Sequence, residues 1–156
     1  MNLWDTYSKS VGNVFLENEG ISLHFDPGIH KALKRLFLSF AHWLRTNYIF
    51  PRHMNVYIQN CETVTLLNGT TAYGSFRWFE FKNPYIRIPA KIQRKYLDLY
   101  TEQENYEMVL SSFVHEITHY YQWLTYENQK NSASECQANY YRYRIIEKYF
   151  KEIYDL

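Results

Sequence analysis

The feature that most constrains the fold of this chain is the pentapeptide His115-Glu116-Ile117-Thr118-His119, which has the form HExxH. On a helix, His115 and His119 differ by about 40° in direction and by one turn in height, so their imidazoles can meet at one point. Two such imidazoles suit a zinc ion, and Glu116, about 100° around the helix, can act there as a general base without being a ligand. The motif therefore predicts a zinc site, provided that the segment is helical.

Chance is the alternative explanation for a motif this short. With six His and twelve Glu in 156 residues, an accidental HExxH has a probability of about 2 percent. In that case both histidines would be ordinary buried or half-exposed side chains. The surrounding sequence has to decide between the two interpretations.

The sequence on both sides of the motif predicts one long helix. Thr101-Glu102-Gln103-Glu104 has the form of a capping box, and apolar residues then recur at helical spacing, at Tyr106, Leu110, Phe113, Ile117 and Leu124. A polar break at 128–131 ends this helix. Residues 132–149 are predicted as a final helix, with one side formed by Cys136, Tyr140, Tyr143, Ile146 and Phe150.

Upstream of the motif the patterns change from helix to strand. Residues 21–25 alternate apolar and polar side chains as a half-buried strand does, and Asp26-Pro27 predicts the start of a helix that ends near Asn47. Further strands are expected at 56–58, at 63–67 before a hairpin turn at Asn68-Gly69, and along the aromatic run at 71–81. A short helix is expected at 90–98.

Residues 85–88 are predicted as an edge strand, because a proline at each end removes backbone donors from the ladder. Ile86 and Ile88 would face the core. Tyr85 and Arg87 would face outward, where we expect them to bind the backbone of an extended substrate by strand addition.

The order of strand, helix, sheet and helices predicts an α+β fold. The sequence contains no repeat, low-complexity tract or linker, so a single domain over residues 1–156 is expected. A chain of this length can bury a core without help from a metal, so bound zinc would serve chemistry rather than folding.

The composition excludes several classes of partner. Seventeen Lys and Arg against sixteen Asp and Glu leave a net charge of +1, so no nucleic-acid partner is implied. Cys61 and Cys136 are too few for a disulfide framework. No secretory leader and no run of about 18 apolar residues is present, so we expect a cytoplasmic protein without a membrane segment.

A catalytic zinc site needs a third protein ligand, and the residues after the motif limit the choice. No histidine follows His119. Glu135 is favoured, because the polar break lets the last helix fold back and present its first turn to the motif. Glu127 is too close to His119 to return, and Cys136 is a further alternative. Ser132-Ala133-Ser134-Glu135 also has the form of a capping box, so Glu135 could instead cap the last helix.

The HExxH segment, followed by Glu135-Cys136-Gln137-Ala138-Asn139, resembles the HExxH…ExxAN pattern of the ImmA/IrrE-type metallopeptidases, which are small zincins of the gluzincin class. The resemblance covers residues 85–141 at most. It implies a zincin-like fold in which a small sheet with an edge strand packs on the active-site helix. It also implies one Zn²⁺ per chain, with His115, His119 and Glu135 as ligands and Glu116 as the catalytic glutamate. A more generic minimal gluzincin fits the same residues.

The expected function is zinc-dependent hydrolysis of peptide bonds in a protein or peptide substrate. Zinc lowers the pKa of its bound water toward about 7, and Glu116 takes the proton and passes it to the leaving amine. Tyr140 and Tyr141 are candidates for stabilising the oxyanion. Asn139, four residues after Glu135, could orient that carboxylate.

A non-catalytic zincin-like module, binding a protein or peptide in a regulatory role, is the alternative from another functional class. Glu116 counts against it, because a merely structural site has no need of a general base. The substrate, the cleavage specificity and the oligomeric state are not specified by these residues.

Overall fold

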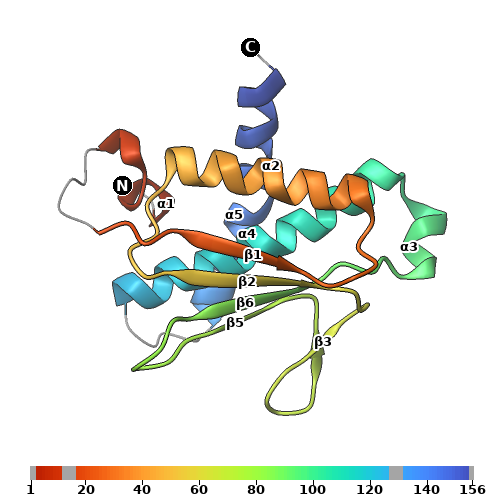
Figure 1. Ribbon diagram of the computed structural model, residues 1–156, viewed down its shortest axis with the longest axis horizontal. Helices are drawn as coiled ribbons and strands as arrows, with labels where there is room; N and C mark the ends of the chain where they lie inside the picture. The colour runs from red at the N-terminus through yellow and green to blue at the C-terminus, as the bar shows by residue number, and fades with distance from the viewer. Residues whose placement is uncertain (1–2, 12–16, 127–131, 155–156) are drawn as a thin grey trace.

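The computed structural model describes residues 3–11, 17–126 and 132–154, which form a small sheet with helices packed on one face (Figure 1). The helices are α1 (Leu3–Thr6), α2 (Lys31–Asn47), α3 (Arg94–Leu99), α4 (Glu102–Tyr126) and α5 (Ser132–Tyr154), with a 3-10 turn η1 at Lys9–Val11. The strands are β1 (Ile21–Phe25), β2 (Met54–Gln59), β3 (Val64–Thr65), β4 (Thr71–Ala72), β5 (Ser75–Arg77) and β6 (Tyr85–Pro89). At this level the mixed fold agrees with the predicted α+β class.

The main sheet has four strands in the order β1-β2-β6-β5. Strands β1, β2 and β6 run parallel, and β5 pairs antiparallel with β6. Strands β3 and β4 form a separate antiparallel hairpin, closed at Asn68-Gly69 as the sequence predicted. Gly69 adopts a φ of 85°, which favours glycine, and Asn68 Oδ1 accepts a hydrogen bond from Thr70 N at 3.0 Å.

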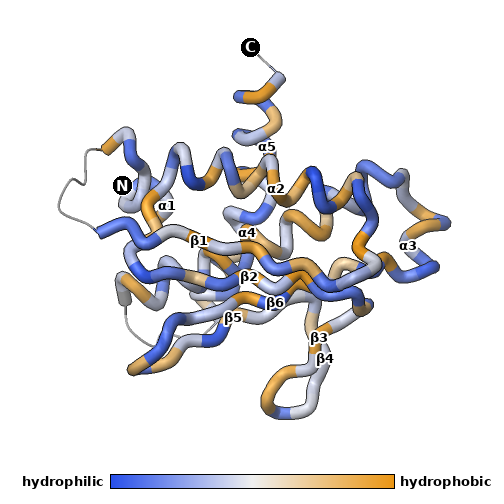
Figure 2. The backbone as a smooth tube through the Cα atoms, viewed as in Figure 1, coloured by the Kyte–Doolittle hydropathy of each residue, from blue (hydrophilic) through white to orange (hydrophobic). Residues whose placement is uncertain are grey.

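One face of the main sheet is covered and the other is open. Most inward-facing side chains of the parallel strands are almost fully buried, namely Ile21, Met54, Val56, Ile58, Ile86 and Ile88. They belong to one hydrophobic cluster with α2 and α4, and Figure 2 shows hydrophobic residues recurring along both helices. On the open face the rings of His24, Tyr57 and Tyr85 form a row, with successive centroids 4.9 and 5.9 Å apart.

Helix α4 begins with the capping box that the sequence predicted. Thr101 Oγ1 accepts from Glu104 N at 3.1 Å, and the Glu104 carboxylate accepts from Thr101 N at 3.0 Å. The sheet lies on one side of α4 and α5 on the other, so nearly all side chains from 109 to 122 are buried. No helix among the described residues is long and apolar enough to cross a bilayer.

Helix α1 connects the two long helices. The indole N–H of buried Trp4 donates to Thr118 Oγ1 on α4 at 3.0 Å, and Leu3 N donates to the Tyr141 hydroxyl on α5 at 3.2 Å. The Tyr7 ring stacks on Tyr121 of α4 with centroids 4.4 Å apart. Helix α1 therefore bonds to both α4 and α5, which also pack directly on each other.

The predicted start of α2 is wrong by several residues, because Asp26 has other partners. Its backbone N–H donates to Ile58 O at 2.9 Å, and its carboxylate accepts from Asn60 N at 3.0 Å. These bonds tie Asp26 to the end of β2. The helix begins instead at Lys31, where the His30 side chain accepts from the N–H of Ala32 at 3.3 Å.

The prediction of an edge strand at residues 85–88 is also wrong. Strand β6 lies inside the sheet between β2 and β5, with Ile86 and Ile88 facing the core as expected. The sequence misleads because prolines 84 and 89 stand at the ends of the strand, where they remove no donor from its middle. The aromatic run at 71–81 is not one strand but is broken at Tyr73-Gly74, and its second part, β5, forms the edge.

The buried face of α5 differs from the side that the sequence indicated. Cys136, Tyr140 and Tyr143 are exposed. The buried side chains are Ser134, Ala138, Tyr141, Ile145, Ile146 and Tyr149. Tyrosines occur on both faces of this helix, so aromatic character alone does not identify the face that packs against α4.

We expect the amides of Ile86 and Arg87 both to exchange slowly with solvent. Ala90 N donates to Gln59 O of β2 at 2.8 Å, so even-numbered amides of β6 point toward β2 and odd-numbered amides toward β5. Amide hydrogen exchange followed by NMR measures this. Fast exchange at Arg87 beside slow exchange at Ile86 is the pattern of an edge strand and would contradict the observed strand order.

Candidate metal centre

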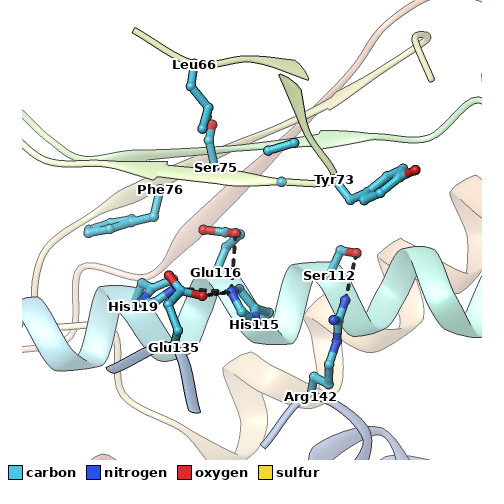
Figure 3. A pocket seen from close by; sticks show the side chains of 12 residues that line it. Leu66, Tyr73, Ser75, Phe76, Ser112, His115, Glu116, His119, Glu135 and Arg142 are labelled. Atoms are coloured by element: carbon cyan, nitrogen blue, oxygen red, sulfur yellow. Dashed lines mark hydrogen bonds and ion pairs between the residues drawn. The ribbon is translucent and has the colours of Figure 1, made fainter. Parts of the chain in front are cut away.

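The structure brings together the three residues that the sequence nominated as metal ligands (Figure 3). His115 and His119 lie one turn apart on α4, with their Nε2 atoms 3.2 Å from each other. Glu135, in the first turn of α5, places one carboxylate oxygen 3.2 Å from His115 Nε2 and the other 3.0 Å from His119 Nε2. Both oxygens are thus directed at imidazoles, which fits a ligand better than a cap of α5.

The donor set fits a zinc ion. Ligand atoms about 2.0–2.2 Å from a tetrahedral metal lie roughly 3.3–3.6 Å from one another. The two histidine Nε2 atoms, 3.2 Å apart, are only slightly closer than this, and each lies 3.0 to 3.2 Å from a different oxygen of Glu135. A small outward movement would make room for the ion. Two imidazoles and one carboxylate are a donor set of catalytic zinc sites, which leave a further position open.

The amide of Gln122 holds His119 in place, a contact that the sequence analysis missed. Its Oε1 lies 2.8 Å from His119 Nδ1, and its Nε2 donates to Ser134 O at 2.9 Å and to Gln137 Oε1 at 2.8 Å. An N–H at Nδ1 leaves Nε2 of His119 with the lone pair that a metal requires. The same buried amide fixes the first turn of α5, which carries Glu135.

His115 is held in its neutral form. Burial, together with the neighbouring His119 and Arg142, lowers the pKa of its imidazole to about 4, against the opposing effects of Glu135 and Asn139. Among the described residues no group reaches the buried Nδ1 with hydrogen-bond geometry, although Asn139 lies close enough to affect the pKa. Asn139, which was predicted to orient the Glu135 carboxylate, is therefore placed beside His115. A neutral imidazole is the form that binds a metal.

Glu116 lies in the same pocket but outside the ligand cluster. Its side chain is buried, and Oε1 is 4.0 Å from His115 Nε2. The backbone at Gly74 passes directly over it, since a Cβ at Gly74 would lie 3.1 Å from both Cγ and Oε1 of Glu116. Glycine at this position therefore leaves the space that the carboxylate fills.

The pocket around these residues has a volume of about 310 Å³. Its floor is the α4 surface that carries the histidines, and its roof is formed by residues 72–76 with Leu66 (Figure 3). Arg142 of α5 also lines it and donates through Nη2 to Ser112 Oγ at 3.2 Å. Neither Ser112 nor Arg142 was identified from the sequence, although Arg142 follows Glu135 by seven residues and so shares its side of α5.

Four other residues nominated from the sequence lie away from the pocket lining. Tyr141 is buried against Trp4, and Tyr140 is exposed beneath Arg144, so neither is placed to stabilise an oxyanion. Arg87 donates to Ser75 Oγ and to Thr65 O, and Tyr85 packs on the open face of the sheet. Because β6 is not an edge, these last two cannot bind a peptide by strand addition. Glu127 lies outside the described residues.

Comparison of the chain with protein-family models, with curated proteins and with solved structures finds no match in any of the three. The resemblance to the ImmA/IrrE-type metallopeptidases therefore stays a prediction from the motif residues.

We expect the metal-free protein to lose stability as the pH falls from about 6.5 to about 4. In the unfolded chain His115 takes up a proton near its ordinary pKa of 6.5, whereas in the folded protein it does so only near 4, so unfolding is favoured across this window. His115→Gln should reduce the loss, and the exposed control His42→Gln should retain it. Chemical denaturation at a series of pH values gives the measurement, and an equal loss in wild type and His115→Gln would contradict it.

Proposed function

We propose that the chain is a zinc-dependent metallopeptidase of the gluzincin class with a zincin-like fold. The observation that carries the proposal is the contact of both Glu135 carboxylate oxygens with the Nε2 atoms of His115 and His119. Glu116 lies in the same pocket without joining the cluster, the position that a general base requires.

The chemistry divides between the ion and the side chains. A bound zinc ion supplies a Lewis acid that polarises a carbonyl and makes water acidic near neutral pH. His115, His119 and Glu135 would hold the ion, with Gln122 orienting one imidazole. Glu116 would remove a proton from the attacking water and return it to the leaving amine.

A catalytic role suits this site better than a structural one. Structural zinc sites are usually closed by four protein ligands, whereas here three candidate ligands line an open pocket. The hydrophobic cluster already joins the sheet to α1, α2, α4 and α5 without a metal. Folding therefore has no need of the ion.

Strand β5 is the edge strand that borders this pocket, and Ser75 and Phe76 line it. An extended protein or peptide substrate would pair with this free edge, with its backbone crossing above Glu116. This placement replaces the strand at residues 85–88 as the binding edge.

The purified protein should hold about one zinc ion per chain, and His115→Ala or His119→Ala should abolish this binding. Glu135→Gln should lower the affinity for zinc by more than about 100-fold. The reason is that losing a ligand should cost more affinity than losing a side chain that only orients a ligand. Metal analysis and competition with a chelator measure these effects. The control Ser132→Ala, which removes the capping alternative, should leave zinc affinity unchanged. Equal affinity in wild type and Glu135→Gln would place the third ligand elsewhere.

Glu116→Gln should retain zinc and lose at least about 100-fold in peptide hydrolysis, the scale of general acid-base assistance. The amide keeps the size of the side chain beneath Gly74 but accepts no proton. Cleavage of a peptide library, followed by rate measurement on one cleaved peptide, provides the assay. Zinc-loaded wild type that cleaves no peptide would instead favour the non-catalytic binding module.

A further inference from the structure

Arg142 lies in the wall of the candidate metal centre. It is half-buried on α5, two turns after Glu135. Its Nη2 donates to Ser112 Oγ at 3.2 Å, and its guanidinium lies over the ring of the adjacent Tyr143, 5.8 Å from the centroid. In the described part of the chain no Asp or Glu forms an ion pair with it. Its Nε is buried and likewise has no hydrogen-bond partner there.

A bound anion would stabilise this arrangement. A buried N–H without an acceptor and a guanidinium without an anion both carry a desolvation cost. A carboxylate in the pocket fits the planar guanidinium with two parallel hydrogen bonds and supplies the anion that it lacks. Because Glu116 and Glu135 line the same pocket, a singly charged carboxylate suits the site better than a phosphate dianion.

Arg142 also stands where two pockets meet. A second pocket, of about 220 Å³, adjoins the first, and both are lined by Tyr73, Ser112 and Arg142. Beyond Arg142 the second pocket is bordered by the apolar side chains of Ile92 and Val109. A ligand could therefore extend from the candidate metal centre past the guanidinium into a partly apolar space.

The spacing of residues along α4 sets the distance between Arg142 and the candidate metal centre. Ser112, which touches Arg142, precedes His115 by three residues and so lies about one helical turn, about 5 Å, along the axis. An extended peptide advances about 3.3–3.6 Å per residue. A carboxylate at Arg142 would thus lie within about two residues of the bond at the metal.

We propose that Arg142, positioned by Ser112, binds a carboxylate of the substrate within two residues of the cleaved bond. The identity of the ligand as a peptide rests on the proposed function, whereas the carboxylate site itself needs no metal. The carboxylate is either the C-terminal group of the peptide or the side chain of an acidic residue, since both present the same two oxygens.

Binding of three peptides to the metal-free full chain tests this proposal. The peptides are acetyl-Ala-Ala-Leu as the free acid, the same peptide as its C-terminal amide, and acetyl-Ala-Glu-Leu amide. Without metal, a carboxylate gains no affinity by coordinating zinc, so a failure of the zinc proposal would not affect the result. NMR titration gives the affinities, and shifts at Tyr73 and Ser112 locate the site.

At least one of the two carboxylate peptides should bind about tenfold or more tightly than the neutral amide, the scale of a charge-assisted hydrogen bond. Preference for the free acid identifies a C-terminal carboxylate, and preference for the glutamate peptide identifies a side chain. Arg142→Gln should remove the preference and Arg142→Lys should retain part of it. Arg144→Gln, which removes the same charge from an exposed position on α5, should leave it intact.

Equal binding of all three peptides to the wild type would overturn the proposal, and this comparison needs no variant to fold. A preference that survives in folded Arg142→Gln would overturn it as well. Circular dichroism of each variant establishes that it is folded.

Discussion

Helix α4 is buried on nearly every side, and this burial constrains the rest of the structure. A polar group removed from water has to find a partner inside the protein, and several polar side chains lie in the buried part of this helix. Thr118 bonds to Trp4, Ser112 to Arg142, and Gln122 to both His119 and the start of α5. The bonds that compensate for burial therefore also fix the helices around the candidate metal centre.

The parts of the structure that the sequence predicted correctly depend on short-range rules. The capping box at Thr101 and Glu104 and the hairpin at Asn68-Gly69 involve residues a few positions apart, whose geometry follows from the backbone alone. The convergence of His115 and His119 likewise follows from helical periodicity. Predicting that Glu135 lies beside the two histidines required only that the last helix fold back against the helix that carries them.

The parts that were missed depend on contacts between distant segments. Asp26 has the local sequence of a helix start, but in the folded chain its carboxylate accepts a hydrogen bond from Asn60 N. Strand β6 is flanked by prolines as an edge strand often is, but β5 pairs with it. Gly74 leaves space for the side chain of Glu116, which follows it by 42 residues, and no local pattern connects the two. Arg142 could have been suspected from its seven-residue spacing after Glu135, but its relation to Ser112 appears only when α4 and α5 are packed together.

The contacts of α1 also set an order of events during synthesis. Leu3 and its partner Tyr141 are separated by 138 positions, so at about 5–20 residues per second roughly 7 to 28 s pass before the partner has been made. During that interval Trp4 has no finished surface on which to dock. The two helices that carry the histidines and Glu135 can thus be bridged by α1 only after α5 has been made as far as Tyr141.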